Sequence, residues 1–293
     1  MQTTGIFTTH RFPVEFDAYG DTIPLFPFGD IHRFAFLCDE AKWLEDLEEM
    51  SRHPKALFLG MGDYDDLAST SERRILGSPD RNDTSQKTIQ HVYLERTMKF
   101  AKEIEFMRGR IIGLIEGNHY GIFPNGMTTT QKLAEMLGCR YLGVSSVIRL
   151  AFINRSRRGR RNTALDVFAH HGLGASRLIG GSLNKVQQMV EGVEADIHLM
   201  GHDHQRGGAF RERLKLHDAN GVLKLVRRKV FFGRTGSYLR GYVENEASYV
   251  ADKGLPPTSL GGIRLDLTPR RIRRNIEGKT RDIDTFVDIR HYQ

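Results

Sequence analysis

Short runs of apolar residues recur along the chain and alternate with longer stretches in which apolar residues repeat at helical spacing. Each short run reaches a glycine and then polar side chains, a pattern typical of a buried strand that leads into a loop. The pattern predicts strands at 22–30, 56–63, 111–119, 165–172, 197–204 and 229–237.

Amphipathic stretches between these runs predict helices at 39–50, 85–107 and 183–190. In the first of them, Trp43, Leu44, Leu47 and Met50 lie on one face. Alternating strands and helices predict an α/β fold in which helices cover the faces of the sheets. The sequence contains no internal repeat or Pro/Ser-rich linker, so we expect a single domain over 1–293. Its core motifs span about 22–240, between an N-terminal extension and a C-terminal decoration.

Composition narrows the class of protein. Of the 293 residues, 39% are hydrophobic and 27% are charged, as in an ordinary globular protein. No apolar run reaches the roughly 20 residues of a membrane helix, and the first residues lack the regions of a signal peptide. The two cysteines, Cys38 and Cys139, exclude a disulfide framework or a cysteine-rich zinc site. We therefore expect a cytoplasmic protein with no membrane partner.

The net charge of +7 is spread unevenly. Five of the seven residues at 155–161 are arginine, and 270–274 holds four more. Such runs are common on solvated loops, but they also attract phosphate-rich partners such as nucleic acid. The net charge alone does not choose between these interpretations.

Polar side chains follow five of the predicted strands at the point where each strand ends. They are Asp30 and His32, Asp63, Asn118 and His119, His170 and His171, and His202 and His204. A single histidine at a strand end is usually structural, and Asp or Asn beside glycine usually forms a turn. Because carboxyl ends of strands form the ligand crevice of α/β sheets, we expect these side chains to meet. Burying so many carboxylates and imidazoles together is costly without a cation, so the sequence predicts a metal site.

The types of ligand indicate the metals. Imidazole, carboxylate and amide donors suit Mn, Fe, Zn, Co or Ni better than the all-oxygen cages of Mg or Ca. We expect two divalent transition-metal ions, with manganese first among them. The seven plausible ligands exceed the needs of one ion, and paired ions about 3.5–4 Å apart need a bridging carboxylate.

The motifs GDIH, GDYDD, GNH, HHG and GHDH resemble, in order and approximate spacing, those of the calcineurin-like metallophosphoesterases. The match covers about residues 26–205, and HHGLGASRLIGGSLNK is also similar to a segment of phage-encoded and bacterial members. The resemblance implies a four-layer αββα sandwich of two mixed β-sheets flanked by helices. It also implies a site for two metal ions at the strand ends.

Carried over motif by motif, the resemblance implies a role for each residue. Asp30, His32 and His204 would hold the first metal, and Asn118, His171 and His202 the second. Asp63 would bridge both ions, and His119 would support the transition state without binding metal. His171 is preferred to His170 because the family's ligand histidine commonly precedes glycine, which leaves His170 beside the ligands or in the core.

Residues next to the motifs have weaker assignments. Asp66 matches the last acid of the second motif and would orient ligands. Tyr120 stands where the family often has an acid, which bears on tuning of the site. Arg33 would reach a substrate phosphate or remain an ordinary surface arginine, and Tyr64 and Tyr120 would line the pocket or pack. The Gly/Pro-punctuated segment 238–262 would form a loop near the site.

The resemblance implies hydrolysis of phosphoesters by metal-activated water, with His119 serving the leaving oxygen. A phosphodiester is the favoured substrate, and the arginine runs keep nucleic acid open as a polymeric one. The alternatives are a phosphomonoesterase, a nucleotide or protein phosphatase, and an inactive scaffold with the same fold. The sequence leaves the oligomeric state open.

Overall fold

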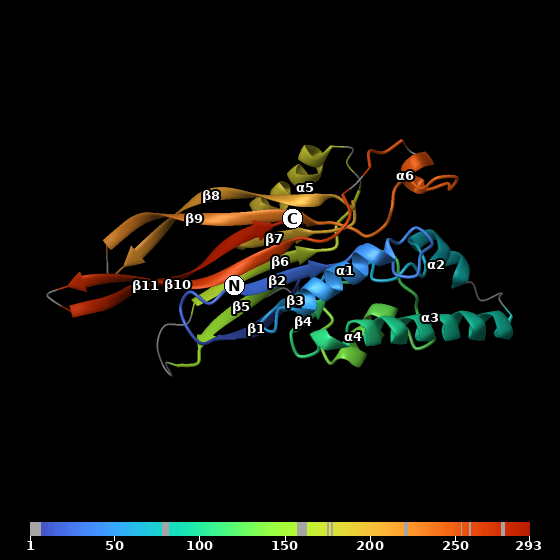
Figure 1. The fold of residues 1–293 in the computed structure, drawn as a ribbon, viewed down its shortest axis with the longest axis horizontal. Helices are drawn as coiled ribbons and strands as arrows, with labels where there is room; N and C mark the ends of the chain where they lie inside the picture. The colour runs from blue at the N-terminus through green and yellow to red at the C-terminus, as the bar shows by residue number, and fades with distance from the viewer. Residues whose placement is uncertain are drawn as a thin grey trace.

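Two β-sheets lie face to face in the computed structural model, with helices α1, α3 and α4 on one outer side and α5 on the other (Figure 1). The structure describes residues 7–77, 82–156, 163–174, 176, 178–219, 222–252, 254–257, 259–276 and 279–293.

The first sheet has six strands in the order β1-β5-β6-β7-β9-β8. It is mixed, because β1–β5, β6–β7 and β7–β9 pair in parallel while β5–β6 and β8–β9 are antiparallel. The bounds of its strands are β1 Thr8–Phe16, β5 Ser145–Asn154, β6 Thr163–His170, β7 Ile197–Met200, β8 Arg206–Ala219 and β9 Val222–Thr235.

The second sheet has five strands in the order β11-β10-β2-β3-β4. It is also mixed, because β2, β3 and β4 are parallel to one another while β10 is antiparallel to both of its neighbours. The bounds of its strands are β2 Ile23–Phe28, β3 Leu57–Gly60, β4 Ile111–Leu114, β10 Arg264–Ile276 and β11 Lys279–Tyr292.

Helices α1, α2 and α4 begin at capping residues. The side chain of Asp39 accepts a hydrogen bond from the backbone N–H of Lys42 at the start of α1, and Ser69 and Thr128 form capping boxes at α2 and α4. The bounds of the helices are α1 Glu40–Ser51, α2 Thr70–Leu76, α3 Asp83–Glu103, α4 Thr129–Leu137, α5 Ile179–Gly192 and α6 Tyr249–Asp252, with a 3₁₀ turn at Glu105–Met107. Among the described residues, no helix is both long enough and apolar enough to cross a membrane.

Three apolar clusters hold these layers together. One lies between the two sheets and includes Leu25 and Phe152; a second packs α1 and α3 onto the second sheet through Trp43. The third packs α5 onto the first sheet through Val186. The molecule therefore has four layers, helix–sheet–sheet–helix. The predicted fold class, an αββα sandwich of two mixed sheets, is confirmed.

The strand ends that carry the predicted ligands come from both sheets. Strands β2, β3 and β4 belong to one sheet, and β6 and β7 belong to the other. Because both sets run in parallel within their sheets, their carboxyl ends open toward the same end of the sandwich. The site, expected at the carboxyl ends of the strands of one sheet, therefore lies between the strand ends of two sheets.

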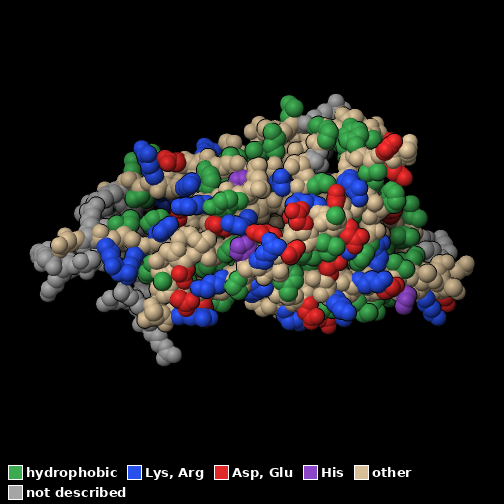
Figure 2. Space-filling view, viewed as in Figure 1, with side chains coloured by type: hydrophobic (Ala, Val, Ile, Leu, Met, Phe, Trp, Pro, Cys, Tyr) green, Lys and Arg blue, Asp and Glu red, His purple; other side chains and the backbone are tan. Residues whose placement is uncertain are grey.

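The described residues of the arginine-rich segments lie at the opposite end. Strand β5 pairs with β6 so that Ser145 faces His170 and Phe152 faces Thr163, which places Arg155 far from the ligand loops. Strand β10 runs antiparallel to β2, so Arg270–Arg273 lie beyond the first residue of β2. Residues 157–162 of the first run lie outside the described residues. Figure 2 shows Lys and Arg side chains interspersed with Asp and Glu over one face of the molecule.

Candidate metal centre

The loops at the carboxyl ends of the strands carry unusual backbone conformations. Among the described residues, seven non-glycine residues have a positive φ, and five of them are predicted ligands. These five are Asp30, His32, Asp63, His202 and His204, with φ between 47° and 74°. Such a conformation costs about 1–3 kcal/mol each and persists where the surroundings enforce it, often at functional sites.

Glycines before the ligands allow the loops to approach one another closely. A Cβ atom on Gly117 would lie 1.9 Å from Oδ1 of Asp63, and one on Gly201 would lie 2.4 Å from Oδ2 of Asp30. A side chain at either position would displace a carboxylate. Gly117 and Gly201 thus each make room for a carboxylate that another loop supplies.

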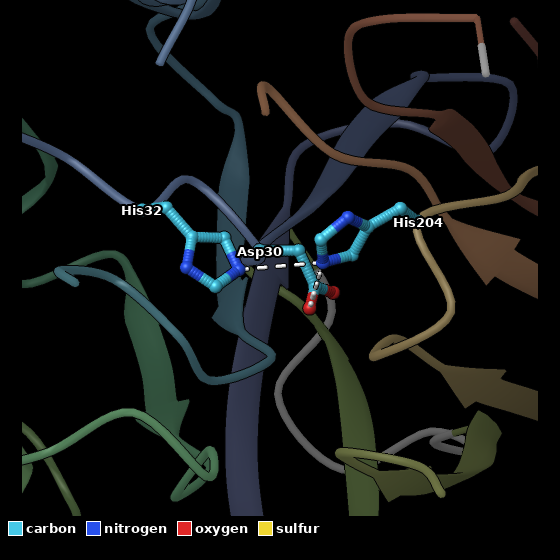
Figure 3. A group of neighbouring side chains, drawn as sticks. All are labelled: Asp30, His32 and His204. Atoms are coloured by element: carbon cyan, nitrogen blue, oxygen red, sulfur yellow. Dashed lines mark hydrogen bonds and ion pairs between the residues drawn. The ribbon is translucent and has the colours of Figure 1, made fainter. Parts of the chain in front are cut away.

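The first group of ligand atoms consists of Asp30, His32 and His204, which point toward one another (Figure 3). Nε2 of His32 lies 3.3 Å from Nε2 of His204, and that atom lies 3.7 Å from Oδ1 of Asp30. Asp30 and His32 follow β2 in one sheet, whereas His204 follows β7 in the other.

The second group consists of Asp63, His171 and His202, with Asn118 beside them. Oδ1 of Asn118 lies 2.9 Å from Nε2 of His171 and 2.7 Å from Nδ1 of His202. The Nδ1 atom of His171 lies 2.8 Å from the carbonyl oxygen of Met61, to which it can donate, so that Nε2 keeps its lone pair for the centre.

Asp63 lies between the two groups. Its Oδ2 atom is 3.3 Å from Nε2 of His171 and 3.9 Å from Nε2 of His32. Its Oδ1 atom accepts hydrogen bonds from the backbone N–H groups of Asn118 and His119, at 2.7 and 2.8 Å. One oxygen is therefore held by the GNH loop, and the other faces both groups.

The residues present fit a pair of divalent transition-metal ions. Among the described residues, Oδ1 of Asp30 is buried and has no hydrogen-bond partner, which is costly unless a cation neutralises it. The donors are imidazole nitrogens and carboxylate or amide oxygens, the set that suits Mn, Fe, Zn, Co or Ni. Burial lowers the pKa of His204 to about 3 and that of His202 to about 4, so both rings are neutral and can donate lone pairs at neutral pH.

Two other groups hold protons in the metal-free protein. Burial raises the pKa of Asp30 to about 7. For His171, burial acts to lower the pKa, but the charge of Asp63 outweighs it and raises the pKa to about 9. Burial likewise opposes ionisation of Asp63, yet the charge of His171 and its hydrogen bond hold the pKa of this carboxyl well below its usual range. Protons therefore compete with metal ions for the ligand atoms of Asp30 and His171.

His119 lies at the edge of the centre and has a fixed orientation. Its Nδ1 atom is 2.9 Å from Oδ1 of Asp66, and the same oxygen is 3.4 Å from Nδ1 of His32. The hydrogen bonds from His119 and His32 lower the pKa of Asp66. Asp66 thus orients both rings through their Nδ1 atoms, and Nε2 of His119 is left for a ligand.

The other predicted residues have partners away from the two groups. Nδ1 of His170 accepts a hydrogen bond from the backbone N–H of Gly172, and this ring belongs to neither group. The guanidinium of Arg33 is buried and donates to Glu40 and Glu103, at 2.7 and 3.1 Å.

The two tyrosines also have partners. The hydroxyl of buried Tyr64 donates to the carbonyl of Ile115 at 2.9 Å, and the ring of Tyr120 lies 3.7 Å from the guanidinium carbon of Arg73. Each side chain thus has a structural partner, and a contact with substrate stays a prediction.

One group that the sequence analysis missed is the buried ion pair of Arg234 with Asp203, at 3.2 Å. Arg234 also donates to the carbonyl of Gly201 at 2.6 Å, and Ser182 of α5 donates to Asp203 at 2.5 Å. These contacts fix the loop that carries His202 and His204. The only signal in the sequence was the aspartate between the two histidines, which does not reveal its partner.

Comparisons with known proteins give limited results. No family model and no curated protein matches the chain. A solved structure of a conserved uncharacterised protein from Streptococcus pneumoniae, described as a predicted phosphoesterase, is 14% identical with a TM-score of 0.30, covering 93% of this chain and 89% of that one. The calcineurin-like phosphoesterase YfkN from Bacillus subtilis is 11% identical with a TM-score of 0.30, covering 92% of this chain and 90% of that one. At these scores neither likeness carries an argument about function, which rests on the residues of the centre.

Proposed function

We propose that the chain is a metal-dependent phosphoesterase of the calcineurin-like metallophosphoesterase type that prefers phosphodiesters. The observation that carries this proposal is the division of the candidate ligands into two groups that share Asp63. A structural zinc site needs one closed set of four ligands, so seven ligands in two groups favour a catalytic pair of ions.

When bound, two divalent ions would lower the pKa of a water molecule and neutralise the charge of phosphoryl oxygens. Asp63 would hold its free oxygen between the two groups while the GNH loop fixes the other oxygen. His119, oriented by Asp66, would hold a proton for the departing ester oxygen. The products are a phosphate monoester and an alcohol.

The proposal is tested with metal-stripped protein reconstituted with Mn, Ni, Zn or Mg. The substrates are bis-nitrophenyl phosphate, nitrophenyl phosphate, nucleotides, single- and double-stranded DNA, and RNA. We expect Mn to restore hydrolysis and the diester to be turned over faster than the monoester. Asp63→Asn serves as the control, because it removes the shared ligand and should lose both bound metal and turnover.

The rival class is a binding scaffold that keeps the fold without activity. It predicts a purified chain that binds no transition metal and hydrolyses none of these substrates in added Mn. The complete set of ligand side chains in the two groups favours the enzyme.

A polymeric substrate is a second candidate, favoured by the arginine-rich segments. Their described residues, such as Arg155 and Arg270, lie at the end of the sandwich away from the centre, so only a long polyanion would reach both. A strand of ten residues such as β5 spans roughly 30 Å, which a single nucleotide cannot bridge. We therefore propose nucleic acid as a second substrate of the diesterase. We also propose manganese as the first metal and the cytoplasm as the location of the protein.

A further inference from the structure

A small cavity lies directly beside the candidate metal centre. It has a volume of about 120 Å³ and is lined by His202 and His204, which also belong to the two ligand groups. Its other lining residues are the apolar Leu37, Leu239, Val250, Leu255 and Pro256 and the polar Ser176, Asp203, Gln205, Arg240 and Ser248. We name it the side cavity.

Backbone and side-chain contacts hold the walls of the side cavity in place. The backbone N–H of Arg240 donates to the carbonyl of Leu37 at 2.9 Å, which joins the loop after β2 to the loop after β9. The backbone N–H of Leu255 donates to the carbonyl of Val250 at 2.9 Å, and the hydroxyl of Tyr242 donates to the carbonyl of Leu255 at 2.6 Å. The segment expected to form a loop near the centre therefore provides one wall of a formed cavity.

The side cavity and His119 lie on different edges of the His32 ring. Nδ1 of His32 faces Asp66, which holds His119, whereas Nε2 of His32 faces His204. The two nitrogens of an imidazole point in different directions. A substrate group in the side cavity is thus separated from the histidine that serves the departing oxygen.

The size and lining of the cavity indicate what it accepts. A dry cavity of about 150 Å³ is known to accept benzene, so 120 Å³ suits a single ring and excludes a fused pair. Although Arg240 and Asp203 also belong to the lining, apolar atoms make up most of its exposed surface, which favours an apolar ring over a charged group that would lose its hydration there.

We propose that the side cavity binds one ring carried by the ester oxygen that stays on phosphorus. This inference rests on the proposed function and deepens it. A water molecule loses one proton to solvent and its oxygen forms a bond to phosphorus. The bond from phosphorus to the departing oxygen breaks, and that oxygen receives a proton from His119, which regains one from solvent. The retained oxygen keeps its ring, so the substrate is a phosphodiester with a cyclic, largely apolar retained group. A monoester lacks this second substituent.

The test uses metal-loaded protein and 4-nitrophenyl phosphodiesters whose retained group is methyl, cyclohexyl or naphthyl. Burial of one ring predicts a kcat/KM about tenfold higher for cyclohexyl than for methyl, after discounting for imperfect desolvation. Leu255→Trp fills the cavity and should bring this ratio close to one. Leu255→Ala enlarges the cavity and should favour naphthyl. Leu225→Trp and Leu225→Ala, at a residue that is 67% exposed on β9, are matched controls that should keep the wild-type ratio.

A second readout does not depend on turnover. Titration calorimetry compares cyclohexyl phosphate with methyl phosphate, and we expect tighter binding of the cyclic compound that Leu255→Trp abolishes. If the protein turns over the diesters but the ratio of kcat/KM for cyclohexyl to that for methyl is the same in wild type and Leu255→Trp, the side-cavity proposal is overturned and the hydrolase is left intact. Selective binding without turnover of any ester would support the cavity and overturn the hydrolase. The absence of both selective binding and turnover would overturn the two together.

Discussion

His119 is the residue whose proposed role is most separable from metal binding. Its ring is held by Asp66 and forms a separate cluster with Asp66 and His32. It belongs to neither of the two ligand groups proposed for the ions, so its loss should leave the ions in place. We expect His119→Ala to lower kcat for a phosphodiester by about 10²–10⁴-fold, the range typical of a positioned general acid. Metal content, measured by elemental analysis, should match the wild type. A variant with full activity would contradict the role of His119.

The protonated state of the metal-free centre predicts that metal affinity depends on pH. Asp30, with a pKa of about 7, and His171, with a pKa of about 9, must lose protons before they can bind a cation. Raising the pH from 6 to 9 removes this competition, so the apparent affinity for Mn should rise across that window. Titration calorimetry in buffers of different ionisation enthalpy would measure the protons released, which should decrease toward pH 9. A flat affinity would contradict these protonation states.

At the scale of elements, the ion pair of Arg234 and Asp203 joins β9 to the loop after β7. Arg234→Met leaves Asp203 buried without its partner, so we expect the free energy of unfolding to fall by about 3–5 kcal/mol in urea denaturation. Combining it with Asp203→Leu removes the second charge and should recover much of the stability. Metal affinity should fall in Arg234→Met and stay low in the double variant, because in both variants the carbonyl of Gly201 lacks its donor. Wild-type affinity would show that the pair only stabilises the fold.

The strands that could be predicted from the sequence are those that carry the site. The predicted segments at 22–30, 56–63, 111–119, 165–172, 197–204 and 229–237 all contain strands, and the first five end before a ligand loop. Strands such as β8 and β10 were missed because charged and apolar residues share them, as in RGGAFRERLKLHDA. β8 lies at a sheet edge, where burial imposes little apolar pattern. β8 pairs with the next strand, β9, whereas β10 pairs with the next strand, β11, and with the distant β2.

The candidate site, too, could be predicted only in part from the sequence. Spacing along the chain indicated which side chains occupy strand ends, but it could not divide them between the two metal ions. The resemblance supplied that division, and the contacts of Asp30, Asp63 and Asn118 agree with it in geometry. Metal binding by these residues stays a prediction. The side cavity was beyond prediction, since its wall is formed by a segment that follows the last motif.

For the whole molecule, the distribution of arginines predicts a difference between polymeric and small substrates. Replacing Arg157, Arg158, Arg160 and Arg161 with serine should weaken nucleic-acid binding and flatten its dependence on salt, because fewer counterions are released. Turnover of a small nitrophenyl diester should be unchanged, because Arg155 and Thr163, which flank this segment, lie at the end of β5–β6 away from His170. Unchanged nucleic-acid affinity and salt slope would remove the support for a polymeric substrate.

Each ligand group takes residues from both sheets, with Asp30 and His32 facing His204 in one group and Asp63 facing His171 in the other. Bound ions would therefore link the two sheets to each other at this end of the sandwich. At a metal concentration of about 100 times Kd, binding stabilises the folded state by about 2.7 kcal/mol. Chelation should then loosen this end first, with faster amide exchange at the ends of β2, β3, β6 and β7. The far part of the β8–β9 hairpin, near Ala219 and Val222, should exchange as before, so that metal loss opens the protein from one end.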